Sequence, residues 1–254
     1  MLGRIFAVSL LAGLAAGLAV SVLQEFTTMP IIIHAEEFEN KGPGGPAKLD
    51  LDRRGLAAPD RIDARLILAS EGAPGHTHDA EAWAPKDGIE RTLFTALFNV
   101  LTAVGFALLL TAAVTLRGEA VTGRTGVLWG IAGFAAVSLA PALGLPPEVP
   151  GAMAAEVTAR QAWWALAAVA TGAGLWLAVL GRAKWMPPVG LLIIASPHIV
   201  GAPHPEKIGG AVPPELAAHF VSASLVTAAV FWVLLGWLVG RFAERLGLMR
   251  PAEA

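Results

Sequence analysis

The chain contains six apolar stretches, and most of them reach the length of about 20 residues that a helix needs to cross a bilayer. They occupy 5–23, 92–116, 125–143, 162–180, 186–200 and 216–239. A backbone inside a bilayer must satisfy its own hydrogen bonds, so such stretches fold as helices. Only 15% of the 254 residues are charged, against about a quarter in a soluble domain. The sequence therefore predicts an all-α fold, a polytopic membrane helical bundle of about six transmembrane helices.

The apolar stretches divide the chain into four regions. Residues 1–23 are expected to form the first transmembrane helix, 24–91 a long extracytoplasmic loop that contains histidines, 92–143 helices two and three, and 144–254 helices four to six with a cytoplasmic tail. Within the loop, apolar residues at helical spacing predict a short amphipathic helix over 60–70. Short connections join the last five stretches, which predicts that they pack as neighbouring hairpins.

The first stretch has two interpretations. Arg4 precedes it and Ala19-Val20-Ser21 would serve as a cleavage site, so it could be a signal peptide. Its apolar run of about 19 residues is longer than the usual 7–15 of a signal peptide, which favours a retained helix. Gly13 and Gly17 would then either let another helix approach closely or serve no packing role.

The distribution of basic residues predicts the orientation in the membrane. With the N-terminus inside, the inner segments carry eight Arg and Lys residues, and the two short outer loops carry two, Arg160 and Lys207. An excess of positive charge marks the cytoplasmic side, so both termini are expected in the cytoplasm. The eight are Arg4, Arg117, Arg124, Arg182, Lys184, Arg241, Arg245 and Arg250.

Composition excludes several kinds of function. The chain has no cysteine, which excludes disulfides, thiolate metal sites and cysteine nucleophiles. Its net charge of -2 gives no basic surplus for binding nucleic acid. No P-loop motif, H-E-x-x-H motif or Ser-His-Asp order is present, so nothing in the sequence argues for an enzyme.

The last four stretches suggest an internal duplication. Pro141-Ala-Leu-Gly144-Leu-Pro-Pro-Glu148 aligns, with two gaps, with Pro197-His-Ile-Val-Gly201-Ala-Pro-His-Pro-Glu206. Two later stretches also end alike, at Gly181-Arg182 and Gly240-Arg241. The chain therefore has a possible duplicated helical hairpin, with both copies in the same orientation.

The densest group of metal-ligand side chains lies in the long loop. His76, His78, Asp79 and Glu81 stand within six residues, and side chains two apart in an extended backbone project to the same side. Imidazole and carboxylate suit Co²⁺, Ni²⁺, Cu²⁺ or Zn²⁺, so these residues are candidate metal ligands. The alternative is a solvated polar turn after Gly72-Ala-Pro-Gly75.

A second candidate group surrounds the last two apolar stretches: His198, His204, Glu215 and His219. The stretch 186–200 is short and has prolines near both ends, which predicts irregular backbone of the kind that lines a transport path. Glu215 and His219 are four residues apart and share a helix face. Ionisable groups at the mouth of a membrane helix indicate function, unless they merely extend to the interface.

Asn99, with Thr95 and Thr102, is expected to bond across helices rather than to contact a substrate.

Together these segments resemble the CbtA family of predicted cobalt transporter subunits. The resemblance covers Leu23-Gln-Glu-Phe26, His76-Thr-His78, 83–92, Leu145-Pro-Pro-Glu148, 160–164, Gly201-Ala-Pro-His204 and Val212-Pro-Pro-Glu215-Leu216. It implies a multi-pass subunit of a cobalt uptake transporter in a bacterial inner membrane, with Co²⁺ as substrate rather than as a permanent cofactor. It also implies a small single-span, histidine-bearing partner of the CbtB type. A nickel permease and a non-transporting metal-binding scaffold or sensor are the alternatives.

Overall fold

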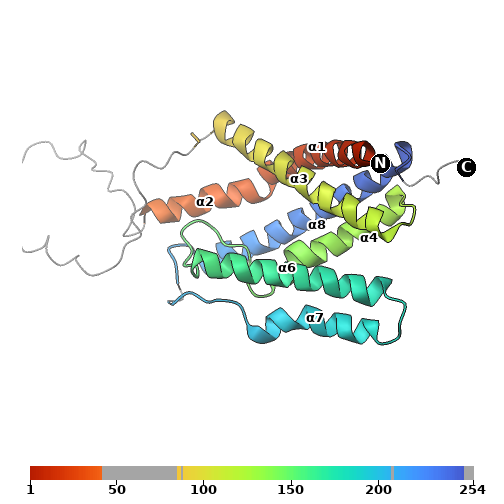
Figure 1. Ribbon diagram of the computed structural model, residues 1–254. Helices are drawn as coiled ribbons and strands as arrows, with labels where there is room; N and C mark the ends of the chain where they lie inside the picture. The colour runs from red at the N-terminus through yellow and green to blue at the C-terminus, as the bar shows by residue number, and fades with distance from the viewer. Residues whose placement is uncertain (42–84, 87, 207–208, 249–254) are drawn as a thin grey trace, which may run out of the picture.

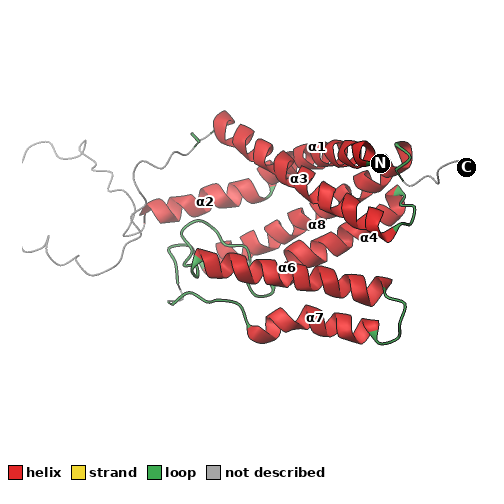
Figure 2. Cartoon of the chain, viewed as in Figure 1, coloured by secondary structure: helices red, strands yellow, loops and turns green. Residues whose placement is uncertain are grey.

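The computed structural model describes residues 1–41, 85–86, 88–206 and 209–248, and every regular element among them is helical. The predicted helix over 60–70 lies outside the described residues. Five helical units are long and apolar enough to cross a membrane, and a sixth is shorter. The all-α, polytopic prediction is therefore confirmed (Figure 2). The elements are α1 (Leu2–Phe26), α2 (Thr28–Lys41), α3 (Ile89–Arg117), α4 (Gly123–Phe134), the π-helix η1 (Ala135–Leu139), α5 (Ala140–Ala142), α6 (Val157–Leu180), α7 (Met186–Val200) and α8 (Pro214–Arg245).

The long helices lie side by side and alternate in direction, as Figure 1 shows. The start of α1 and the turn that follows α8 meet at one end of the bundle, where Arg4 Nη1 donates to the Gly247 carbonyl oxygen at 2.8 Å. We call this the terminal end, and the opposite end, from which α2 projects, the α2 end. The described basic residues that were expected to be cytoplasmic all belong to helix ends or loops at the terminal end.

The outside of the bundle is apolar. Leu109, Val169 and Leu192 are 67%, 70% and 67% exposed. Leu109 and Val169 belong to helices long enough to cross a membrane, and Leu192 belongs to the shorter apolar helix α7. Exposed apolar surface on this scale is unfavourable in water and is expected where lipid chains surround a protein. The small buried core lies between α1, α3 and α8, where Val8, Ala12 and Leu235 are fully buried.

Glycines let α1 approach α3 closely. A Cβ atom built at Gly13 would lie 2.5 Å from Val104 Cα, and one built at Gly17 would lie 2.6 Å from Val100 Cα. Ser9 Oγ donates to Thr111 Oγ1 across the same interface at 3.1 Å. Small residues and hydroxyl bonds replace the hydrophobic effect, which does not drive helix association in lipid. The close-approach interpretation of Gly13 and Gly17 is confirmed.

The remaining helices do not pack simply on their neighbours in the sequence. α4 packs mainly against α8, and α7 contacts α6 but not α8. The prediction that consecutive helices pack as hairpins is therefore confirmed in part: α6 packs on α7, and it also meets the preceding membrane unit through η1 and α5, whereas α3 barely touches α4. The pairs α4–α8 and α6–α7 both cross at glycines: Gly126 and Gly130 face Gly236, and Gly174 faces Gly190. Which helices pair is therefore decided by where glycines let two backbones approach closely, and not by the length of the loops between helices. The first helix of each suggested repeat thus packs on the second helix of the other, an arrangement compatible with a duplication.

Irregular backbone occurs at a different place from the one expected. α7 is a continuous helix despite Pro197, whereas the third membrane unit contains the π-helix η1 just before Pro141. A π-helix widens the turn and often marks a functional site. A break at Thr27 separates α1 from α2, and α2 lies within the region 24–91.

Candidate functional site

A cavity of about 320 Å³ lies among α1, α2, α3, η1 and α8, in the half of the bundle nearer the α2 end. Its walls combine aromatic and aliphatic side chains with an unusual number of neutral polar groups. These polar residues are Gln24, Thr28, Asn99, Thr102, Ser138, Ser224 and Thr227. Polar groups inside a membrane bundle are costly unless they bond to one another or face water.

Asn99 connects α3 to α1. Its Nδ2 atom donates to Gln24 Oε1 at 2.7 Å and to Ser21 Oγ at 3.1 Å. The expectation that Asn99 bonds across helices is therefore confirmed. Because both amide hydrogens are used on α1, the oxygen Oδ1 of Asn99 remains as an acceptor at the cavity wall.

Thr227 connects α8 to the break between α1 and α2. Thr27 Oγ1 donates to the Leu23 carbonyl oxygen at 2.9 Å and lies 3.1 Å from Thr227 Oγ1. A hydroxyl has one hydrogen, so Thr227 is the donor in the second bond. The lone pairs of Thr227 Oγ1 are consequently left for the cavity that this residue lines.

Three aromatic rings close the cavity towards the terminal end. The ring of Trp232 lies 4.9 Å from that of Phe106 and 5.7 Å from that of Phe231. Trp232 Nε1 donates to Ser138 Oγ of η1 at 3.2 Å, so the π-helix holds this indole in place. We call Phe106, Phe231 and Trp232 the aromatic floor.

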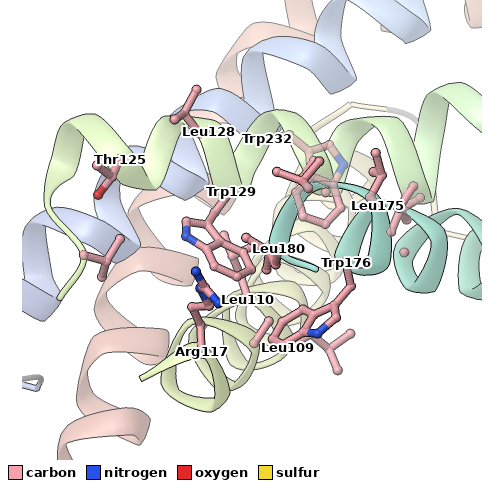
Figure 3. A pocket seen from close by; sticks show the side chains of 18 of the residues that line it. Leu109, Leu110, Arg117, Thr125, Leu128, Trp129, Leu175, Trp176, Leu180 and Trp232 are labelled. Atoms are coloured by element: carbon pink, nitrogen blue, oxygen red, sulfur yellow. The ribbon is translucent and has the colours of Figure 1, made fainter. Parts of the chain in front are cut away.

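A second cavity, of about 490 Å³, lies on the other side of the floor between α3, α4 and α6. It shares Phe106 and Trp232 with the first cavity but is lined almost entirely by apolar side chains. Figure 3 shows Leu110, Trp129 and Trp176 around it. Arg117 stands at its edge at the terminal end and pairs with Glu119 at 2.7 Å. Its lining offers little to a small polar solute.

The candidate metal ligands of the long loop, His76, His78, Asp79 and Glu81, lie outside the described residues. The segment that carries them leaves α2 at Lys41 and returns before Ile89, both at the α2 end.

The second candidate group is not brought together. His198 is half-buried in the last turn of α7, with its ring 5.6 Å from that of Trp163. Glu215 and His219 are exposed on the first turns of α8, on the same helix face as the exposed Val226. His204 is exposed in the loop between the two helices, which do not contact each other. Among the described residues, no three His, Asp or Glu side chains lie close enough to hold a metal ion.

Ion pairs and a helix cap organise the α2 end. Glu156 caps α6 by accepting bonds from the backbone amides of Thr158 and Ala159, and these bonds hold the pKa of its carboxyl below the usual 4.5. Arg160 pairs with Glu148 at 2.6 Å and thereby ties α6 to the preceding loop. Arg91 of α3 donates to Glu36 of α2 at 3.0 Å, which fixes the start of α3 against α2.

Of the polar residues of the cavity, the sequence pointed to Asn99 and Thr102 alone. The missed signal is the spacing of two polar pairs, since Asn99 with Thr102 and Ser224 with Thr227 are each three residues apart. Such a pair places two polar groups on one face of an apolar helix. Both faces meet at the cavity, together with Gln24 and Thr28 from either side of the break between α1 and α2.

The bundle, its apolar surface and its internal polar cavity are those of a multi-pass helical membrane protein. Residues 2–244 match the CbtA family, described as probable cobalt transporter subunit, and the chain belongs to that family. Comparison with curated proteins and with solved structures gives no match. The family resemblance stated from the motifs is confirmed, and membership places the chain among transporter subunits rather than among enzymes in the usual sense.

Proposed function

We propose that this chain is the membrane-embedded subunit that carries Co²⁺ across a bacterial inner membrane, with both termini in the cytoplasm. The observation that carries the proposal is the family match over nearly the whole chain. The gathering of the described basic helix ends at the terminal end supports the orientation, because positive charge favours the cytoplasmic side. The α2 end then faces outward.

In this proposal the outer face collects the metal. His76, His78, Asp79 and Glu81 belong to a segment that starts and ends at the α2 end, where His204, Glu215 and His219 are exposed. Neutral imidazole and carboxylate bind Co²⁺ and Ni²⁺, and they lose affinity when the imidazoles are protonated below a pKa of about 6.5. His198 contributes less readily, because its ring packs against Trp163.

Uptake at limiting metal tests the collecting role. Replacing His76 and His78 together by alanine should lower Co²⁺ uptake at low external metal and leave uptake at saturating metal nearly unchanged. His34→Ala is the matched control, because His34 is also exposed near the α2 end but belongs to α2, where it pairs with Glu37. Equal uptake by all three proteins at every concentration would contradict collection by the loop. Competition with Ni²⁺ in the same assay decides between the two metals.

The description as a subunit implies a partner. We propose a small single-span, histidine-bearing protein of the CbtB type, which would add imidazole ligands that the described residues do not supply as a group. Co-purification with the chain from membranes tests this pairing. Uptake that does not change when the partner is removed would contradict it.

A non-transporting metal-binding scaffold or sensor is the second candidate. One observation favours it: the polar cavity ends at an aromatic floor, and the cavity beyond the floor is apolar. A scaffold would bind Co²⁺ without accumulating it inside cells, whereas a transporter subunit would do both.

A further inference from the structure

We propose that the polar cavity between α1, α2, α3, η1 and α8 is the site within the membrane where the transported cation rests, still carrying its water shell. This inference rests on the proposed function and adds to it a binding site distinct from the outer His and carboxylate groups. Its ligand class is a hydrated divalent cation.

The size of the cavity fits such an ion. Its volume of about 320 Å³ corresponds to roughly ten water molecules at about 30 Å³ each. This volume is large enough for an octahedral cation together with its six coordinated waters.

The chemistry of the walls points the same way. The described lining residues include no carboxylate and no imidazole, which are the side chains that most readily displace water from Co²⁺ or Ni²⁺ when thiolates are absent. The lining residues offer neutral oxygens, which accept hydrogen bonds from metal-bound water. Weak, multi-partner binding is what a transport path requires, since the ion must also leave.

The hydrogen-bond pattern leaves these oxygens available. Asn99 and Thr227 use their hydrogens on α1 and Thr27, so their oxygens remain as acceptors. The hydroxyls of Thr28, Thr102 and Ser224 make no hydrogen bond within the described part of the chain. Thr28 is buried, Ser224 is half-buried and Thr102 is exposed, and all three line the cavity. An unbonded hydroxyl that faces a space wide enough for water can bond there to water or to a polar ligand.

The three unbonded hydroxyls give a test that spares the fold. Thr28→Val, Thr102→Val and Ser224→Ala, combined in one protein, remove the oxygens without breaking any described bond. Thr171→Val is the matched control, because Thr171 is 3% exposed in α6, has an unpartnered hydroxyl and does not line the cavity.

Binding is read through Trp232, which lines the cavity. Paramagnetic Co²⁺ quenches indole fluorescence at short range, so CoCl₂ is titrated into the purified full-length chain in nanodiscs. The signal of Trp232 is obtained by subtracting the same titration of a Trp232→Phe variant. We expect the triple variant to bind at least tenfold more weakly at this site, which corresponds to about 1.4 kcal/mol. The Thr171→Val protein should match the unsubstituted chain.

The outcomes separate this inference from the proposed function. Two results would overturn the inference: Co²⁺ quenches Trp232 of the triple variant at the same concentration as in the Thr171→Val control, or Co²⁺ does not quench Trp232 in any of the proteins. Either result would mean that the cation does not rest in the cavity, whether or not cells accumulate cobalt. If Trp232 is quenched and the triple variant loses the quenching, the site stands. It then stands even if uptake measurements overturn transport by this chain.

Discussion

Replacing Gly236 by alanine tests the close packing of α8 on α4. Gly236 lies at the crossing of α8 and α4, where a Cβ atom would lie 2.7 Å from Gly130 Cα and closer still to the Gly126 carbonyl oxygen. Ordinary contacts of a Cβ atom are 3.4–4 Å, so the two helices would have to separate by roughly 1 Å. Both partners are backbone atoms and cannot rotate away. Overpacking of this kind costs about 1–3 kcal/mol.

The control for this change is Gly172→Ala. Gly172 is also in a membrane helix, α6, but nothing lies within 4 Å of a Cβ atom built there. Alanine at an open helical position gains about 0.5–1 kcal/mol over glycine. This gain in intrinsic helix propensity is the same at both positions, so the free energies of unfolding of the two variants, measured by reversible denaturation in mixed micelles, should differ by the overpacking cost of about 1–3 kcal/mol. Equal stability of the two proteins would refute the close crossing of α4 and α8.

Three further predictions follow from other contacts. Asn99→Val removes the bonds to Gln24 and Ser21 and should lower the free energy of unfolding by roughly 1 kcal/mol in the same denaturation assay, as interhelical bonds in membranes do. Glu156 has a lowered pKa in the folded chain, so its cap stabilises the fold above about pH 4.5 and the benefit is lost as the pH falls through the lower folded value. Glu156→Gln should therefore be less stable than the unsubstituted chain at pH 7, with the difference shrinking below pH 4.5; a difference that stays constant with pH would contradict the cap. Cysteines introduced at Ala211 and Ala120 lie at opposite ends of the bundle, so an impermeant thiol reagent outside intact cells should label only the first; the reverse pattern would contradict the proposed orientation.

The sequence predicted the helices well because hydropathy alone decides which segments enter a bilayer. It placed their ends less well: α6 begins at Val157 rather than 162, and α8 runs from Pro214 to Arg245 rather than over 216–239. The difference arises because helices continue through polar interface residues that no longer count as apolar. α2 was not expected for the same reason, since Glu36, Glu37 and Asn40 interrupt its apolar pattern.

Helix pairing and the cavity could not be predicted from hydropathy. All lipid-facing helices look alike on that scale, and the choice of α8 as the partner of α4 depends on where glycines allow backbones to meet. The cavity is assembled from five elements, each contributing one or two neutral polar residues whose individual signal is weak. The histidines gave a stronger signal, yet His198 and His219 stand on helices that do not contact each other. Residue type indicated a metal, whereas only the packing shows which polar groups share a space.

Accumulation of radioactive Co²⁺ tests most directly whether this chain carries cobalt. Bacterial cells that produce the chain together with its small single-span partner are compared with cells that produce the partner alone, at limiting external cobalt and with membrane levels of the proteins matched. The proposed function predicts that Co²⁺ accumulates inside the first cells well above the second. Cobalt that binds to membranes containing the chain, without any rise in the cytoplasmic fraction, would contradict transport and leave a metal-binding scaffold.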